Sequence, residues 1–324
     1  MTDYTGKVIF VAGGSSGLGK SIAEILVTRG AHVTVFGRKV KVLEETKGQL
    51  LGLAPSTKQE INAVQLDLTD AEQVVKVFAE QPRLPDALYC VAGGCVSQLG
   101  FFTDLSTQQL EQCMQSNYLT SIYPAHALLR AWIEEDKTYA AAKGKGGPAR
   151  IRDIVFISSA AALCNVPGYI AYAAPKCAQR AIADTLRQEA AIYSTSTSQY
   201  KMHVAFPNTF VTEAFIDEQK TKPELTKRIE SSNKPLEKLD TAEYIANTIV
   251  KRVAKGDFAI LSDFDTEVLW SNMLGSSPKR GLGVLDSVLG LLSGFFVWPV
   301  LRFTWTRMCR QAGKDTAVKI NGTK

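Results

Sequence analysis

A serine, a tyrosine and a lysine lie close together in residues 154–176, which read IVFISSAAALCNVPGYIAYAAPK. Tyr172 follows Ser159 by 13 residues and precedes Lys176 by four, so a helix here would place the phenol and the ammonium on one face. A phenol has a pKa of about 10, and a neighbouring ammonium stabilises the phenolate and lowers that value. The spacing therefore predicts that Tyr172 protonates a carbonyl oxygen as a hydride arrives at the carbon. Taken singly, such residues more often serve packing or capping.

Glycines gather directly after the first apolar run of the chain. Residues 13–19 read GGSSGLG, between a strand expected over residues 7–12 and a helix expected to stop at Gly30. Glycines at a strand-to-helix turn let the backbone approach a pyrophosphate at the helix N-terminus. The pattern favours a dinucleotide site over an ordinary tight turn. The residues expected to contact the cofactor are Gly13, Ser15, Ser16, Gly17, Leu18 and Gly19.

The ends of the second and third expected strands indicate how the dinucleotide is held. An NAD site usually carries an acid after the second strand, whereas this chain has Arg38 and Lys39. A guanidinium can grip a 2′-phosphate, so we expect NADPH; a solvated loop is the alternative. Asp67, followed by Leu68, is a candidate acceptor for the adenine amino group. Capping of the next helix by Asp67 or Thr69 explains the segment equally well.

Apolar, β-branched runs alternate with longer helical patterns along the chain. Unbroken apolar strands separated by helices indicate βαβ crossovers and a parallel sheet buried on both faces. The predicted fold class is therefore α/β, a doubly wound parallel sheet of the Rossmann type. The strands are expected at residues 7–12, 31–37, 61–67, 86–92, 150–159, 200–206 and 257–262.

Two polar segments are expected to lie outside this sheet. Residues 136–149 are rich in Lys, Gly and Ala and should form an exposed loop. Residues 213–236 are polar with scattered apolar side chains and fit a mobile amphipathic flap. We expect a catalytic domain over residues 1–265, flap included, and a C-terminal extension over residues 266–324.

With the glycine loop, the Tyr-x-x-x-Lys motif and the upstream serine in this order, roughly residues 5–262 resemble the short-chain dehydrogenase/reductase family. The resemblance implies that Ser159 orients the substrate carbonyl, that Tyr172 is the acid, and that Lys176 lowers its pKa and holds the nicotinamide ribose. It also implies that Asn117 anchors a water in the proton relay, and Ser158 is a neighbour able to share the role of Ser159. The cofactor contacts implied near the nicotinamide are Gly93, Tyr172, Lys176, Pro207, Val211 and Thr212.

Two positions depart from the family pattern. The family's Asn-Asn-Ala-Gly after the fourth strand reads Cys90-Val91-Ala92-Gly93 here, so any stabilising hydrogen bond from the first Asn is missing. The Thr before the glycine loop is Ala12. Neither departure removes a catalytic group.

Within this family the chain is most similar to 3-ketodihydrosphingosine reductases of the fungal type, in residues 13–38, in residues 206–230 and in the hydrophobic C-terminal extension. The similarity implies NADPH-dependent reduction of a long-chain keto-sphingoid lipid at the endoplasmic reticulum membrane, with the catalytic domain facing the cytosol. One alternative is another reductase of this family, acting on a steroid, retinoid or 3-oxoacyl substrate. An alternative of another class is a non-catalytic nucleotide-binding sensor or scaffold.

The C-terminal extension contains an apolar segment over residues 284–305, in which residues 287–301 carry no charge. As a helix, this uncharged run would extend about 22 Å against a hydrocarbon core of about 30 Å, too short to span unaided. Flanking basic residues, with Trp298 and Trp305, suit an element lying in an anionic membrane surface. Pro299 is expected to favour a bent or re-entrant hairpin. The alternative is packing on a partner subunit or on the main sheet.

Composition and residue spacing narrow the remaining classes of function. A net charge of +5 over 324 residues does not indicate nucleic-acid binding, and 45% hydrophobic residues allow a buried core. The spacing of cysteines and histidines predicts no metal site, and the six cysteines are expected to be buried thiols without disulfides. The N-terminus does not read as a signal peptide. The family resemblance implies a homo-oligomer, a dimer or tetramer, paired through helices over residues 107–135 and 171–193.

Overall fold

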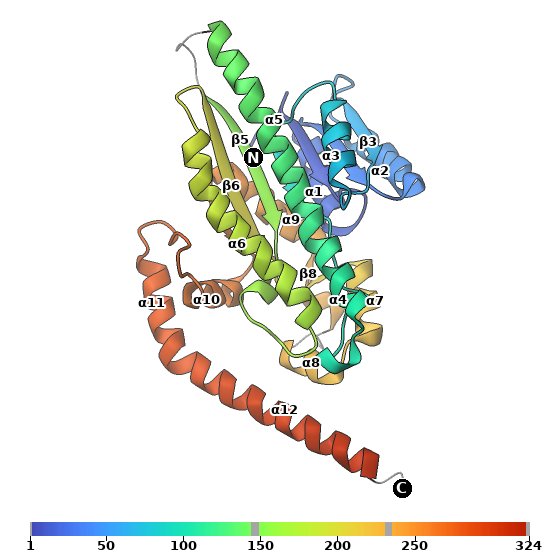
Figure 1. Ribbon diagram of the computed structural model, residues 1–324, viewed down its shortest axis with the longest axis vertical. Coiled ribbons are helices and arrows are strands. Elements are labelled where there is room, and N and C mark those ends of the chain that lie inside the picture. The colour runs from blue at the N-terminus through green and yellow to red at the C-terminus, as the bar shows by residue number, and fades with distance from the viewer. Residues whose placement is uncertain (1, 144–148, 231–234, 322–324) are drawn as a thin grey trace.

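The computed structural model describes residues 2–143, 149–230 and 235–321, and its centre is a seven-stranded parallel sheet (Figure 1). The strand order is β3-β2-β1-β4-β5-β6-β9, so the chain builds outward from β1 and then crosses back to β4. Ligands bind at such a reversal, outside the carboxyl ends of the strands. The strands are β1 (Val8–Ala12), β2 (His32–Gly37), β3 (Ile61–Gln65), β4 (Ala87–Cys90), β5 (Arg150–Ile157), β6 (Ser198–Phe206) and β9 (Ala259–Leu261).

Helices cover both faces of this sheet (Figure 1). Successive strand residues face opposite sides, so Phe10 and Ala12 of β1 enter one core, while Ile9 and Val11 enter the other. This arrangement confirms the predicted doubly wound α/β fold. The helices over the first core are α3 (Ala71–Ala79), α5 (Thr120–Lys143) and α6 (Ile170–Tyr193), and those over the second are α1 (Gly17–Thr28), α2 (Val40–Leu53) and α9 (Ala242–Lys255).

Helix α5 is longer than the sequence pattern predicts. The predicted loop over residues 136–149 is wrong for residues 136–143, which continue α5, and residues 144–148 lie outside the described residues. Asp136 is buried, forms an ion pair with Arg150 of β5 and accepts a hydrogen bond from the Tyr200 hydroxyl of β6 at 2.6 Å. The Ala and Lys residues that follow favour helix, so the segment extends α5 rather than leaving it.

The C-terminal extension forms α10 (Phe264–Asn272) and then one long helix, made of α11 (Val284–Leu292), a π-helical turn (Ser293–Val297) and α12 (Trp298–Asn321). The predicted re-entrant hairpin at Pro299 is therefore wrong, whereas the helix does bend between α11 and α12 (Figure 1). In the π-helical turn the Trp298 N–H bonds to the Ser293 carbonyl, five residues back, and this wider turn accommodates a following residue that has no N–H.

By length and composition, the stretch Val284–Asp315 is long and apolar enough to cross a membrane. The mean hydropathy of its 18-residue window is 1.8, and 11% of that window is buried in the protein. This stretch is therefore longer than the uncharged run of residues 287–301, which alone is too short to span a membrane.

The segment expected to form a flap contains two helices, α7 (Glu213–Thr221) and α8 (Glu224–Glu230). Residues 231–234 lie outside the described residues. The short strands β7 (Phe210–Val211) and β8 (Asp240–Thr241) pair on either side of the segment and bring its two ends together. Helix α8 contacts α12, so the segment lies between the sheet and the C-terminal helix. Its mobility stays a prediction.

Candidate active site

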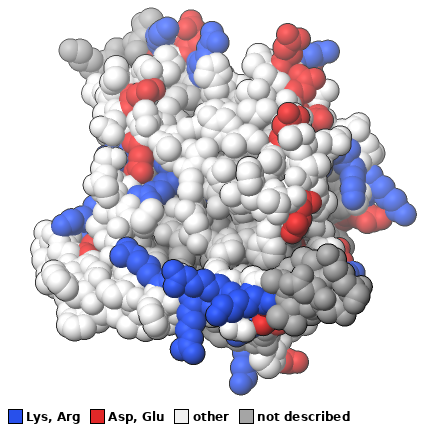
Figure 2. All heavy atoms as spheres, turned by 60° about the horizontal axis from the view of Figure 1, so that its bottom comes forward, with Lys and Arg blue, Asp and Glu red and all other residues white. Residues whose placement is uncertain are grey.

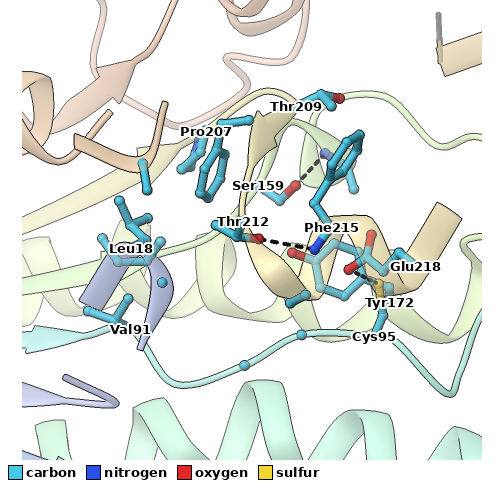
Figure 3. Close-up of a pocket in the computed structure, with 18 of the residues that line it drawn as sticks. Leu18, Val91, Cys95, Ser159, Tyr172, Pro207, Thr209, Thr212, Phe215 and Glu218 are labelled. Atoms are coloured by element: carbon cyan, nitrogen blue, oxygen red, sulfur yellow. Dashed lines mark hydrogen bonds between the residues drawn. The ribbon is translucent and has the colours of Figure 1, made fainter. Parts of the chain in front are cut away.

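A pocket of about 1770 Å³ lies at the carboxyl ends of β1, β4, β5 and β6. It extends from the glycine loop past the catalytic segment to α7 and the C-terminal helix, and Figure 3 shows Leu18, Ser159, Tyr172 and Thr212 around this space. The predicted site residues that line it are Gly13, Ser15, Ser16, Gly17, Leu18, Gly19, Arg38, Asp67, Leu68, Gly93, Ser159, Tyr172, Lys176, Pro207, Val211 and Thr212. Within the described chain, Lys39 and Asn117 are the two predicted site residues outside this lining.

The glycine loop fits a pyrophosphate because Gly13 and Gly19 leave no room for side chains and the loop leads into the N-terminus of α1. Gly13 has φ +91°, and a Cβ there would lie 2.5 Å from the Ala92 nitrogen. A Cβ on Gly19 would overlap the Gly13 carbonyl oxygen. The α1 N-terminus has no side-chain cap from Ser16 and no acid in its first turn. An anion can therefore bind the unpaired backbone N–H groups of this helix.

Arg38 and Asp67 lie at the adenosine end expected for this loop. Arg38 is exposed and lines the pocket, whereas Lys39 is the N-cap residue of α2 and lies outside the lining, so its contact with the cofactor stays a prediction. Asp67 accepts hydrogen bonds from the Thr69 N–H at 2.9 Å and from its hydroxyl at 2.7 Å. These bonds, with the Arg38 charge, hold the pKa of Asp67 below its usual value. The cap of α3 is Asp70, not Asp67 or Thr69.

The two serines at the end of β5 face different partners. Ser158 is buried, and its Oγ donates to the Lys176 carbonyl oxygen at 2.9 Å. Ser159 accepts from the Ala161 N–H at 3.2 Å and lines the pocket together with Tyr172 (Figure 3). Ser159 is therefore the serine placed to meet a bound carbonyl, and Ser158 fixes α6 against β5.

Tyr172 and Lys176 share one face of α6, as their spacing predicts. The Lys176 Nζ lies 5.5 Å from the centroid of the Tyr172 ring and donates to the Ile157 carbonyl oxygen at 2.9 Å. Burial lowers the pKa of Lys176 to about 8. Burial also raises the pKa of Tyr172 well above 10, a shift opposite to the lowering expected from Lys176. The phenol is accordingly held in its protonated form.

Asn117 lies behind the pocket, in a π-helical turn (Gln115–Leu119) between α4 (Thr107–Met114) and α5. Its side chain donates to the Gly94 carbonyl oxygen at 2.8 Å and accepts from the Gly94 N–H at 2.9 Å. Its own carbonyl oxygen accepts from Gln179 Nε2 at 2.8 Å and from Ser121 Oγ at 3.2 Å. Asn117 thus holds the loop that carries Gly93, and the predicted anchoring of a water stays a prediction.

Gly93 brings this loop close to the catalytic lysine. A Cβ at Gly93 would lie 2.5 Å from Asn117 Oδ1 and 3.4 Å from Lys176 Nζ. Cys90, at the position of the family's first Asn, is buried, and its thiol faces the Ser121 carbonyl oxygen at 3.5 Å. Cys90 therefore packs in the core beneath α5, and the residues that follow it in the chain line the site.

Sequence reasoning missed a polar cluster on the far side of Tyr172. Glu218 of α7 contacts the Cys95 thiol at 3.5 Å, and both residues line the pocket (Figure 3). Lys222 forms an ion pair with Glu230 at 2.9 Å, and the Tyr169 hydroxyl donates to the same carboxylate at 2.9 Å. Glu218 and Lys222 are four residues apart, a spacing that could have indicated an ion pair on one helix face. The segment was predicted only as a flap, and no chemical role was expected for these two residues.

The chain is similar to several known proteins. The short chain dehydrogenase family matches residues 7–216. The chain is 31% identical to a 3-ketodihydrosphingosine reductase of Aspergillus fumigatus, over 93% of this chain and 84% of the relative. It is 30% identical to a 3-dehydrosphinganine reductase of Danio rerio, over 86% of this chain and 77% of the relative. A solved short-chain type dehydrogenase/reductase from Mycobacterium ulcerans has a TM-score of 0.64 at 20% identity, covering 80% of this chain and 89% of that chain. This last similarity is evidence for the fold alone.

Proposed function

We propose that this chain, which belongs to the short-chain dehydrogenase/reductase family, reduces the 3-keto group of 3-ketodihydrosphingosine to the alcohol with NADPH. One observation carries the proposal: the pocket that holds Ser159, Tyr172 and Lys176 is also walled by the apolar C-terminal helix. A ketone with a long alkyl chain matches a pocket of this composition. The helix residues in its lining are Val297, Trp298, Leu301 and Trp305.

Members of this family use NAD or NADP, and the residues at the adenosine end support NADP. Arg38 lines the pocket directly after β2, where an NAD site usually carries an acid. A guanidinium there can bind a 2′-phosphate through two parallel charge-assisted hydrogen bonds. When bound along the glycine loop, the reduced nicotinamide supplies a hydride to the carbonyl carbon.

The pocket residues provide the proton and the orientation for this reduction. Ser159 Oγ holds the carbonyl oxygen beside the Tyr172 hydroxyl, since both side chains line the pocket. Because the pKa of Tyr172 is raised, the phenol is protonated at neutral pH and donates its proton to the carbonyl oxygen. The phenolate that forms is then close to the Lys176 ammonium, whose Nζ lies 5.5 Å from the ring centroid. The product is the alcohol at the former keto carbon.

Membrane association gives the lipid substrate access to this pocket. Apolar side chains on the C-terminal helix are exposed, Phe295 and Phe296 to 71% and Phe303 to 70%. Figure 2 shows Lys and Arg side chains in a band across the face where α12 lies, and the helix contributes Arg302, Arg307, Arg310 and Lys314. Exposed apolar rings with basic flanks suit binding to an anionic membrane surface. The cytosolic face of the endoplasmic reticulum is the location we propose, and a homo-oligomer stays a prediction.

The test is turnover of 3-ketodihydrosphingosine in detergent micelles, followed as NADPH oxidation. Parallel reactions use NADH, a steroid ketone, a retinoid and a 3-oxoacyl thioester. We expect turnover with the first ketone and NADPH, and Tyr172→Phe should lower kcat by about 10²- to 10⁴-fold while NADPH binding is retained. Turnover of a rival ketone instead would identify another reductase of the family. NADPH binding without turnover of any ketone would favour a sensor or scaffold.

A further inference from the structure

The Glu218 carboxylate lies in the wall of the catalytic pocket rather than on the protein surface. It is 15% exposed, lines the pocket with Tyr172 and contacts the Cys95 thiol at 3.5 Å. Its charge acts on the Tyr172 side chain, where it is one cause of the raised pKa. A group bound next to the Tyr172 hydroxyl therefore experiences the field of Glu218.

The positive charge in this part of the pocket pairs with a carboxylate other than that of Glu218. Lys222 has a fully buried side chain, and its Nζ lies 2.9 Å from Glu230 but 3.9 Å from Glu218. The Tyr169 hydroxyl also donates to Glu230, which strengthens that pair. Two carboxylates thus share one ammonium among the described residues of the cluster. Burial raises the pKa of Glu218, while Lys222 and the bond from Cys95 act in the opposite direction.

The chemistry of the proposed substrate supplies the missing charge at the right place. In a 3-keto sphingoid base, a primary ammonium is attached to the carbon next to the carbonyl. When the carbonyl oxygen is held by Ser159 and Tyr172, this ammonium is one carbon away from the reacting centre. Steroid ketones and 3-oxoacyl thioesters carry no cation there, so a carboxylate in this wall would discriminate against them.

We propose that Glu218 binds the ammonium of the substrate through a charge-assisted hydrogen bond and thereby selects α-amino ketones, an inference that rests on the function proposed above. Glu218 is then a specificity residue, and Glu230 with Lys222 is a structural pair that fixes α7 and α8 beside it. Cys95 packs against the carboxylate on the side of the loop after β4.

The experiment compares two ketones of equal chain length, 3-ketodihydrosphingosine and the analogue in which hydrogen replaces the 2-amino group. Wild-type protein should favour the amino ketone in kcat/KM by on the order of 10- to 100-fold, the range expected for a hydrogen bond between charged groups. Glu218→Gln keeps the shape of the side chain and should remove most of this preference through a higher KM for the amino ketone. The kcat/KM for the deamino ketone should change less than that for the amino ketone, so the ratio of the two values measures the contact with the ammonium.

Glu224→Gln is the matched control, because Glu224 is exposed on α8 outside the pocket lining. It should keep the wild-type preference. NADPH binding verifies that each variant is folded, and Glu218→Asp, which keeps the charge, should retain part of the preference. The inference is overturned if wild-type protein reduces both ketones equally well, or if Glu218→Gln retains the preference. If wild-type protein reduces neither ketone, the proposed function itself is wrong.

Discussion

The Ser158 hydroxyl and the Lys176 carbonyl oxygen form a buried hydrogen bond of 2.9 Å that joins the end of β5 to α6. Because Ser159 is the next residue of the chain and Tyr172 is one turn away from Lys176, this bond sets the distance between the two side chains that meet the substrate carbonyl. The adjacent serines therefore have separate tasks, one in holding the site and one in the chemistry.

Substituting the two serines should separate these tasks. Ser158→Ala removes a buried hydrogen bond and should lower the free energy of unfolding by about 1–2 kcal/mol, measured by urea denaturation. Ser159→Ala should instead lower kcat, by about tenfold or more, with little change in stability. Equal effects of both substitutions on kcat and stability would show that the serines act as one unit.

The buried Lys176 ammonium should leave a signature in the pH dependence of stability. Its pKa is lowered from 10.5 to about 8, so between these values the unfolded chain binds the extra proton. The free energy of unfolding therefore rises with pH from about 8 to 10.5, by up to about 3 kcal/mol from this group. Relative to Lys176→Met, wild-type protein should gain stability over this range.

Lys41→Met, which removes an exposed lysine of α2, controls for the loss of one positive charge. Denaturation of all three proteins is measured between pH 7.5 and 10.5. Curves for wild-type protein and Lys176→Met that stay parallel over the whole range would mean that Lys176 is not titrating there.

Cofactor preference should depend on Arg38 and not on its neighbour. Arg38→Ala removes the group proposed to bind the 2′-phosphate, so KM for NADPH should rise about tenfold or more while KM for NADH changes little. Lys39→Ala is the matched control, because Lys39 lies outside the pocket lining. A larger effect of Lys39→Ala than of Arg38→Ala on the NADPH-to-NADH ratio would reject the proposed contact.

Two faces of the C-terminal helix should be separable by mutation. Phe295 and Phe303 are exposed and do not line the pocket, so the double substitution to Asp should reduce binding to anionic liposomes by on the order of 100-fold. Reduction of a short, water-soluble ketone should be unaffected. Asp at Thr304 and Thr306, two exposed polar positions, adds the same charge and should reduce liposome binding far less. Liposome binding that survives loss of both phenylalanines would rule out this face as the membrane contact.

The positions of the strands along the chain and the glycine loop could be predicted because each depends on local pattern. The run ending at Ala12 is apolar throughout, and the positive φ of Gly13 follows from the turn that must come next. Helix α5 could not be delimited in this way, because Asp136 is held by Tyr200, 64 residues away. At Pro299, the sequence pattern contained no sign of the π-helical turn that precedes it.

The main residues of the site could also be predicted from local pattern, whereas the pKa shifts within the site could not. Spacing placed Lys176 beside Tyr172, but the solvent exclusion that raises the pKa of the phenol comes from residues distant in sequence. Glu218 meets Cys95 across 123 positions of the chain, so its part in the pocket could not be inferred from neighbours. Arg38 and Lys39 are adjacent in sequence, and only the structure shows that Arg38 lines the pocket while Lys39 is the N-cap residue of α2.

The helix of Val284–Asp315 is a wall shared between the pocket and the exterior, with Trp298 and Leu301 on the inner side and Phe295 and Phe303 on the outer. If the outer side rests in a bilayer, substrate and product exchange laterally with the lipid and never cross open water. The concentration that governs saturation is then the mole fraction of ketone in the membrane. Diluting the ketone with inert phospholipid at constant bulk concentration should slow turnover.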